Sequence, residues 1–293
     1  MSADNPGFVL PVDKPVGPTS HDVVAMTRRA LGLQRIGHTG TLDPFASGLL
    51  LLCVGWATRL SEYLTALDKS YEAVARLGVT TDTEDDQGSV LEERGGWDVL
   101  THDEIDAAFD HLRGEILQVP PQFSAKKVDG EAMHRRARRR EQVDLPPAAV
   151  TVHNLELSGV ELPFVRFRVR CSSGTYVRSL ARDLGTVLGV GAHLTELRRS
   201  SIGAYSVESA VSTDELGDAE SVTRAAIDPL RAVSHLAVFD VATADASELA
   251  MGRPVPFDGP VPGGPVAISR DKALIAIGEA VGDRLHPRKV FAQ

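Results

Sequence analysis

The stretch Gly37-His-Thr-Gly-Thr-Leu-Asp43-Pro-Phe-Ala-Ser-Gly48 decides how the rest of this sequence is interpreted. Its three glycines, two threonines and single proline come with little hydrophobic periodicity, so it predicts an ordered loop. The proline after Asp43 favours an extended backbone at this aspartate, and many of the neighbouring side chains are small. Loops of this kind on a rigid frame often carry catalytic groups, whereas an isolated Asp-Pro more often opens a turn through an Asx hydrogen bond. Both interpretations of Asp43 stay open on this stretch alone.

Helices and strands are predicted on both sides of this loop. Thr19 and Ser20 are candidate N-caps for a helix over residues 20–31, and Gly32 stands where a C-terminal glycine is expected. After the loop, the apolar run at 49–54 predicts a buried strand. Further strands are predicted at 70–77, 150–157 and 164–171, and further helices at 57–67, 105–112 and 176–188. These elements predict a fold that combines α-helices and β-strands.

Two segments depart from this pattern. Prolines bracket the segment 119–150, which is basic and has few large apolar side chains, so we expect an excursion from the core that could close over a partner. From residue 236 onward, short β-like runs alternate with Gly/Pro turns. These features predict a main domain over 1–235 and a small β domain over 236–293.

Composition restricts the class of protein. The chain has 293 residues, 43% of them hydrophobic and 24% charged, which excludes disordered, collagen-like and coiled-coil classes. Its longest apolar run, at 48–57, is well short of the roughly 20 residues that a membrane span needs. Cys53 and Cys171 lie far apart and outside metal-ligand spacing, which argues against a disulfide framework and a zinc ribbon. No signal-peptide pattern is evident at the N-terminus, so we expect a cytoplasmic protein with no membrane association.

Charge is distributed unevenly along the chain. The net charge is −9, but residues 82–110 alone carry eleven acidic residues and one arginine. Residues 124–140 and 166–199 each carry seven basic residues against two acidic ones. This pattern fits a protein with an acidic outer face and a basic working face that binds a polyanion, although charge runs are also common on any solvated surface.

Several common chemistries find no support in the sequence. No paired carboxylates, HExxH or GxSxG motif accompany Asp43, which disfavours glycosidase, metalloprotease and serine hydrolase activities. No cluster has metal-ligand spacing, and no GxGxxG or P-loop motif offers a nucleotide site. We therefore expect no metal and no cofactor.

Five motifs in the same order resemble one family. Residues 37–48 closely resemble the catalytic loop of the TruB family of tRNA pseudouridine synthases. The other matches are Asp13-Lys-Pro-Val-Gly-Pro-Thr-Ser20, Lys69-Ser-Tyr71 with the segment that follows it to Gly88, Cys171-Ser-Ser-Gly-Thr-Tyr-Val-Arg178 with Asp183-Leu-Gly185, and Gly191-Ala-His-Leu-Thr-Glu-Leu-Arg-Arg199. Together they extend over about residues 8–206, which makes a chance resemblance very improbable.

The resemblance implies roles for three catalytic residues. Asp43 matches the catalytic aspartate, which acts at ribose C1′ either as a nucleophile or as a base that abstracts a ribose proton. Arg178 matches the arginine that pairs with this aspartate, although a phosphate contact is the alternative. Tyr71 matches the tyrosine that stacks on the target uracil and takes or relays the C5 proton.

The resemblance also implies residues that bind the RNA. Those near the flipped-out base are His38, which fills the vacated space, Tyr176 and Leu197, which line the uracil pocket, and Lys14, which shapes the adjacent loop. Those expected on the RNA backbone lie in the insertion at about 119–150, which is similar to the family's RNA-clasping insertion: Lys126, Lys127, Arg136, Arg138 and Arg139. The C-terminal segment 236–293 is similar in size and β character to the family's PUA-like domain. For the main domain, the resemblance implies an α+β fold with a mixed, largely antiparallel central sheet, flanking helices and a cleft that holds Asp43.

The activity that follows from the resemblance is isomerisation of uridine 55 in the T loop of tRNA without a cofactor. A tRNA-folding chaperone function could accompany or replace it, and a guide-RNA-dependent synthase subunit is a third alternative. The expected partner is the T-arm stem-loop of tRNA, and no protein partner is implied.

Overall fold

The computed structural model describes residues 7–123, 127–128, 131–132, 139 and 145–291. Lys126, Arg136 and Arg138, expected on the RNA backbone, lie outside these residues. Lys127 belongs to the short pair formed by β8 (Lys127–Val128) and β9 (Glu131–Ala132), and Arg139 is an exposed turn residue. The expected RNA contacts of the insertion therefore stay predictions.

A ten-stranded mixed sheet forms the main body of the protein. Its strands lie in the order β14 (Val211–Ser212), β1 (Gly7–Lys14), β3 (Ser47–Gly55), β12 (Ala192–Ile202), β4 (Lys69–Leu77), β11 (Phe164–Cys171), β10 (Ala148–Glu161) and β7 (Gly114–Gln118). β2 (Ile36–His38) pairs with β3, and β13 (Tyr205–Ser206) pairs with β12. The pairs β1/β14 and β12/β3 are parallel and the others antiparallel, so the expected mixed, largely antiparallel sheet is confirmed.

The two halves of this sheet meet at a narrow join between β3 and β12. These strands pair only through Arg198 with Ser47 and Arg199 with Gly48. Gly48 has a φ of 105°, and a Cβ there would lie 2.3 Å from the carbonyl oxygen of Arg199. Glycine is therefore required at this position both for its backbone conformation and for the close approach of the strands. The loop that contains Asp43 leads directly into this join.

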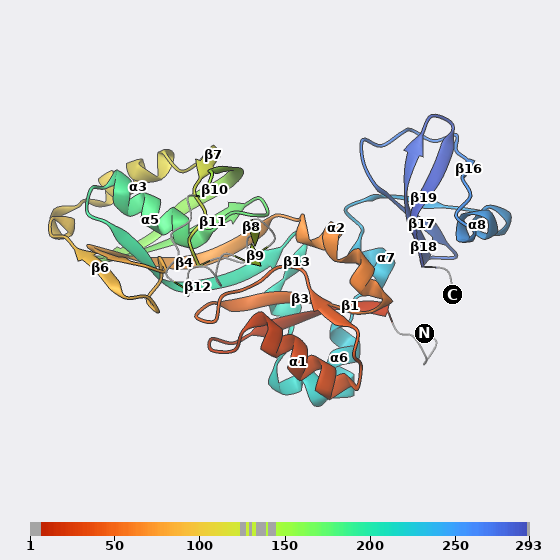
Figure 1. Ribbon diagram of the computed structural model, residues 1–293, viewed down its shortest axis with the longest axis horizontal. Coiled ribbons are helices and arrows are strands. Elements are labelled where there is room, and N and C mark those ends of the chain that lie inside the picture. The colour runs from red at the N-terminus through yellow and green to blue at the C-terminus, as the bar shows by residue number, and fades with distance from the viewer. Residues whose placement is uncertain (1–6, 124–126, 129–130, 133–138, 140–144, 292–293) are drawn as a thin grey trace.

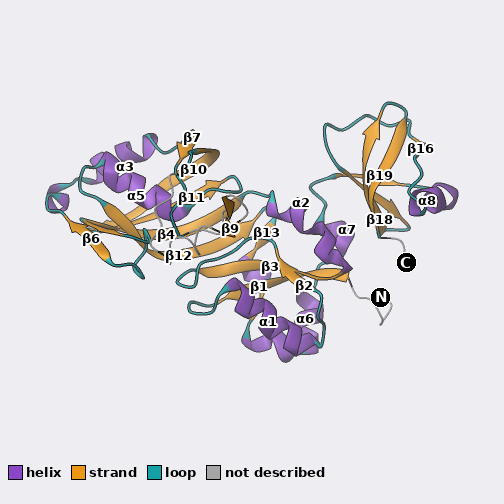
Figure 2. Ribbon diagram, in the orientation of Figure 1, coloured by secondary structure: helices purple, strands orange, loops and turns teal. Residues whose placement is uncertain are grey.

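Helices pack on one face of the half that contains β4, β10 and β11 and on both faces of the half that contains β1 and β3, where Leu64 and Ala232 contribute to the second face (Figures 1 and 2). α1 (Ser20–Leu31) begins with a capping box between Thr19 and Asp22 and ends at a left-handed Gly32, as expected. Together with α6 (Ala219–Ala225) it lies over the half that contains β1 and β3. α3 (His102–Asp110), capped by Thr101, and α5 (Val177–Val187) pack over β4, β10 and β11.

Some elements differ from the sequence prediction. The predicted helix 57–67 is a 3₁₀ helix, η1 (Trp56–Leu60), followed by the short α2 (Ser61–Thr65). The first and last residues of the stretch 37–48 pair with β3 and β12, because tertiary contacts extend strands into a segment without β periodicity. The remaining elements of the main body are β5 (Val79–Thr81), β6 (Val90–Glu93), η2 (Trp97–Val99), η3 (Val207–Ser209), η4 (Asp214–Gly217) and α7 (Pro229–Ala232).

A second sheet stands at the C-terminal end (Figure 1). Its five strands lie in the order β15 (Ala237–Asp240), β17 (Val266–Arg270), β18 (Ala273–Val281), β19 (Arg284–Val290) and β16 (Val255–Pro256). The helix α8 (Thr243–Ala250), which the sequence reasoning missed, packs on it. Phe291 stacks on Trp56 with ring centroids 4.8 Å apart, which attaches this sheet to η1. The boundary at 235/236 and the PUA-like character of this part stay predictions.

Candidate active site

A cavity of about 480 Å³ opens where the Asp43 loop, β4, β12 and the start of α5 come together. Of the residues for which the sequence predicts a role, its lining includes Asp43, Tyr71, Tyr176, Arg178 and Leu197. These side chains come from segments far apart in the chain. The structure thus places five of the predicted site residues around one space large enough for a nucleotide, since small-molecule pockets are typically about 300–1,000 Å³.

Hydrogen bonds fix the Asp43 loop to α1 and to the segment that connects β1 to α1. The Ser20 hydroxyl accepts a hydrogen bond from the Leu42 amide at 2.8 Å and donates to the Leu42 carbonyl at 3.0 Å. The Gly17 amide donates to the carbonyl of Pro44 at 2.8 Å. The loop is therefore held on both sides of Asp43, and the carboxylate itself stays 34% exposed toward the cavity.

Arg178 is the charged partner of Asp43. Its Nε lies 2.9 Å from Oδ2 of Asp43, and its side chain is buried. Its Nη1 donates to the carbonyl of Thr83 and its Nη2 to that of Phe123, both at 2.8 Å. A guanidinium that is anchored by two carbonyls cannot rotate away, so its charge-assisted hydrogen bond orients the Asp43 carboxylate. The Arg178–Asp43 pairing that the resemblance implies is therefore present in the structure, and the role of Arg178 in a reaction stays a prediction.

The loop that holds Arg178 contains two acidic residues that the sequence reasoning missed. Oδ2 of Asp85 lies 3.5 Å from Nη1 of Arg178, and burial raises the pKa of Asp85, while the Thr83 hydroxyl and Arg178 lower it. Glu84 has a φ of 63° and binds Ser179 and Arg182 of α5. These contacts hold the loop against the first half of α5, which carries Arg178. The available signal was the position of both acids directly after Thr81-Asp-Thr83 in the second motif.

Tyr71 and Tyr176 are held in different ways. Tyr71 lies on β4, is 8% exposed, and has its pKa raised by burial, while the positive charge of Arg199 opposes this rise. Tyr176 precedes α5, and its backbone exchanges two hydrogen bonds with the side-chain amide of Gln118, at 2.8 and 3.1 Å. Gln118 is 1% exposed and is a further site residue that the sequence reasoning missed.

Lys14 and His38 are not part of the cavity lining. Lys14 is fully buried, and its Nζ donates to the carbonyls of Pro15 and Pro18 at 2.9 and 2.8 Å, so it shapes the adjacent loop. Burial lowers its pKa to about 8. His38 packs edge-to-face on His21, which does line the cavity, with ring centroids 5.2 Å apart, and burial lowers its pKa to about 4. Their roles toward a substrate stay predictions.

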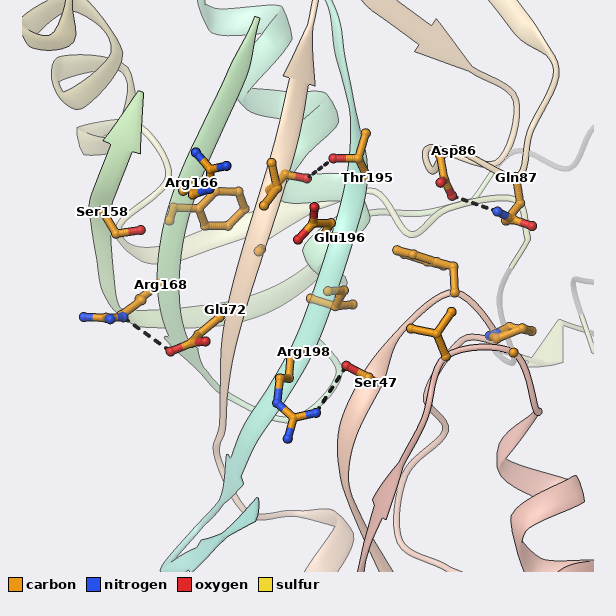
Figure 3. Close-up of a pocket in the computed structure, with 18 residues that line it drawn as sticks. Ser47, Glu72, Asp86, Gln87, Ser158, Arg166, Arg168, Thr195, Glu196 and Arg198 are labelled. Atoms are coloured by element: carbon orange, nitrogen blue, oxygen red, sulfur yellow. Dashed lines mark hydrogen bonds and ion pairs between the residues drawn. The ribbon is translucent and has the colours of Figure 1, made fainter. Parts of the chain in front are cut away.

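A larger cavity of about 810 Å³ lies on the open face of the sheet (Figure 3). Glu72, Arg166 and Arg168 project into it, on the opposite face of their strands from Tyr71 and the core. Its arginines already have acidic partners: Arg166 with Glu161 at 3.0 Å, Arg168 with Glu72 at 3.6 Å and Arg198 with Asp13 at 2.7 Å.

The basic segment 166–199 is therefore compensated in the folded protein. Arg170 pairs with Asp68 at 3.0 Å, and Arg178, Arg182 and Arg199 are bound to acidic groups or carbonyls. The sequence alone suggested a basic working face here. It could not show these ion pairs, because the acidic partners lie on other strands and loops. The smaller cavity, with its anchored and partly exposed carboxylate, remains the candidate active site.

Within the described ranges, no three His, Cys, Asp or Glu residues are grouped so that they could hold a metal ion. No helix of the described chain is long and apolar enough to cross a membrane.

Comparisons with known proteins agree with this geometry. A family model described as TruB family pseudouridylate synthase (N terminal domain) matches residues 28–177, and one described as tRNA pseudouridylate synthase B C-terminal domain matches 178–233. A tRNA pseudouridine synthase B of Thermobifida fusca is 52% identical over 71% of this chain and 73% of its own. The protein of that name from Mycobacterium tuberculosis is 42% identical over 97% of this chain and 95% of its own.

Solved structures show the same fold. The archaeal box H/ACA sRNP Nop10–Cbf5 complex matches with a TM-score of 0.74 and 29% identity, over 97% of this chain and 86% of the matched chain. A Cbf5–Nop10–Gar1 complex matches with a TM-score of 0.75 and 30% identity, over 97% and 84% of the two chains. The family models, the relatives and the arrangement around Asp43 agree, and the chain belongs to the TruB family of pseudouridylate synthases.

Proposed function

We propose that this protein converts uridine 55 in the T loop of tRNA to pseudouridine, with Asp43 acting at ribose C1′ of a flipped-out nucleotide. The observation that carries the proposal is the Arg178–Asp43 ion pair of 2.9 Å at the edge of a cavity that also contains Tyr71. Relatives named tRNA pseudouridine synthase B, which match up to 97% of the chain, support tRNA as the substrate.

The chemistry needs what this cavity provides. The bond between uracil N1 and ribose C1′ breaks, a bond between C1′ and uracil C5 forms, and C5 loses its proton while N1 gains one. Asp43 either attacks C1′ or abstracts a ribose proton, and its partly exposed carboxylate suits both steps. The target uracil must leave its stack in the RNA at a cost of a few kcal/mol. Stacking of this uracil on the buried ring of Tyr71 offsets part of that cost.

The test compares Asp43→Asn with wild-type protein on a T-arm stem-loop and on whole tRNA. Asparagine keeps the shape but removes the charge, so pseudouridine formation disappears while RNA binding, which depends on phosphate contacts elsewhere, is kept. Asp86→Asn is the matched control, because Asp86 is exposed and lines the other cavity. Turnover by Asp43→Asn above background would refute the assignment, and product at another uridine would refute the position.

Two other functions have distinct signatures in the same experiment. A tRNA-folding chaperone refolds misfolded tRNA with Asp43→Asn as well as with wild-type protein, so a refolding assay shows whether this activity accompanies catalysis. The likeness to H/ACA complexes favours, as a second candidate, a synthase that uses a guide RNA. Activity of the purified chain on tRNA without any guide excludes this alternative. A reaction on tRNA also suits the cytoplasmic location that we propose.

A further inference from the structure

Arg199 is a buried cation in the cavity, and the roles proposed above do not include it. Its side chain is 1% exposed, and it lines the same space as Asp43. Its Nε donates to the carbonyl of Leu49 at 2.7 Å, and its Nη2 donates to the carbonyl of Gly40 at 3.1 Å. Arg178 has two carboxylates around it, whereas no described carboxylate forms an ion pair with Arg199.

This charge acts on the groups around it. Burying a cation without a counter-ion is costly, so its retention calls for a reason beyond two carbonyl contacts. Its field contributes to the lowered pKa values of Lys14, His38 and Lys69, after the larger effect of burial. The positive potential at this side of the cavity therefore favours any neighbouring group that becomes negative.

Tyr71 is the neighbour best placed to use this potential. Arg199 and Tyr71 face each other in the antiparallel pairing of β12 and β4, and both line the cavity. Three described groups act on the Tyr71 phenol: Arg199 from β12, Cys171 from β11 and Asp43 from its loop. Cys171 and Asp43 raise its pKa and Arg199 lowers it, in addition to the dominant increase from burial.

We propose that Arg199 is the positioning residue for proton removal from C5, holding Tyr71 and stabilising the negative charge that develops on its oxygen as its hydroxyl proton leaves, before that oxygen accepts the C5 proton. This inference rests on the proposed function. When the new C1′–C5 bond has formed, the C5–H bond breaks and its electron pair forms the C5=C6 double bond. The hydroxyl proton of Tyr71 passes to water, the Tyr71 oxygen then takes the C5 proton and is a neutral phenol again, and N1 takes up one proton from solvent.

The kinetic consequence is specific to one step. General acid–base groups contribute about 10²–10⁴-fold, so loss of the guanidinium slows C5 deprotonation by about 10- to 100-fold if Tyr71 is retained. This step then limits the rate, and deuterium at C5 of the target uridine slows the variant more than the wild type. A merely structural role would lower the amount of active enzyme without changing the isotope effect.

The experiment measures single-turnover rates on tRNA with protium or deuterium at C5 of the target uridine. Arg199→Gln and Arg199→Lys are compared with Arg198→Gln, a change at the adjacent arginine, which faces Asp13 on the open side of the sheet. We expect a slower reaction and a larger C5 isotope effect for Arg199→Gln, partial rescue by Arg199→Lys, and wild-type values for Arg198→Gln. In a Tyr71→Phe background, Arg199→Lys should add little.

The outcomes separate this inference from the proposed function. If the wild type makes no pseudouridine in tRNA, the proposed function fails. If the wild type is active and the Arg199 variants are slow with an unchanged isotope effect, the inference is wrong. Should Arg199→Gln not fold, Arg199→Lys alone decides, because it keeps the charge but cannot make both carbonyl contacts with the geometry of a guanidinium.

Discussion

Gly48→Ala tests the join on which the site depends. Gly48 has a φ of 105°, and a Cβ would lie 2.3, 2.7 and 2.9 Å from the carbonyl oxygen, amide nitrogen and carbonyl carbon of Arg199. A left-handed backbone costs a non-glycine residue roughly 1–2 kcal/mol. Overpacking adds roughly 1–3 kcal/mol, since the contacts are with backbone that cannot rotate aside. We expect a loss of roughly 2–5 kcal/mol, which is a large part of a typical domain's stability.

Gly17→Ala is the matched control, because Gly17 has a φ of 113° but no atom within 4 Å of the added Cβ. It should cost only the backbone strain, roughly 1–2 kcal/mol. Guanidinium denaturation with linear extrapolation measures both variants. Pseudouridine formation should also fall further in Gly48→Ala, because the change displaces Arg199 and the end of the Asp43 loop. Equal losses of stability in the two variants would refute the close approach of β3 and β12.

Two further predictions concern buried polar groups. Gln118→Leu should lower the free energy of unfolding by about 1–3 kcal/mol, because it removes the acceptor of the Tyr176 amide and one of the two donors to the Tyr176 carbonyl, whereas Leu117→Ala on the exposed side of β7 should have little effect in the same denaturation assay. Burial lowers the pKa of Lys14 from its ordinary value of 10.5 to about 8 in the folded protein, so above pH 8 the unfolded chain binds more protons and stability rises with pH. This rise should be seen between pH 8 and about 9, before ionisation of Cys53 and Cys171 in the unfolded chain opposes it, because burial raises their folded pKa values from 9.0 to about 12 and 11. Across this window the free energy of unfolding should rise less in Lys14→Met than in the wild type, by up to about 1 kcal/mol. An equal rise in both proteins would contradict the burial of the Lys14 charge.

Local signals explain which elements could be predicted. Thr19 and Gly32 bound α1, and Thr101 begins α3, because caps satisfy backbone groups within a few residues of themselves. Alternating apolar residues in β11 predicted that strand from its own sequence. η1 and α2 were harder, since an apolar stretch there packs partly against the C-terminal sheet, and α8 has no strong cap.

The fold class and the family could be predicted from the sequence, and Asp43, Tyr71 and Arg178 could be named as candidate site residues, because these predictions depend on motifs and short-range periodicity. Which charges are compensated became clear only in the folded protein: Arg178 is anchored between Asp43 and Asp85, whereas Arg199 has carbonyl partners. The same holds for Gln118, which supports Tyr176, and for the arginines of β11, which face acidic residues on the open side of the sheet. A charge or a buried amide is satisfied by whatever the fold brings within a few ångströms, and its position along the chain does not reveal those partners.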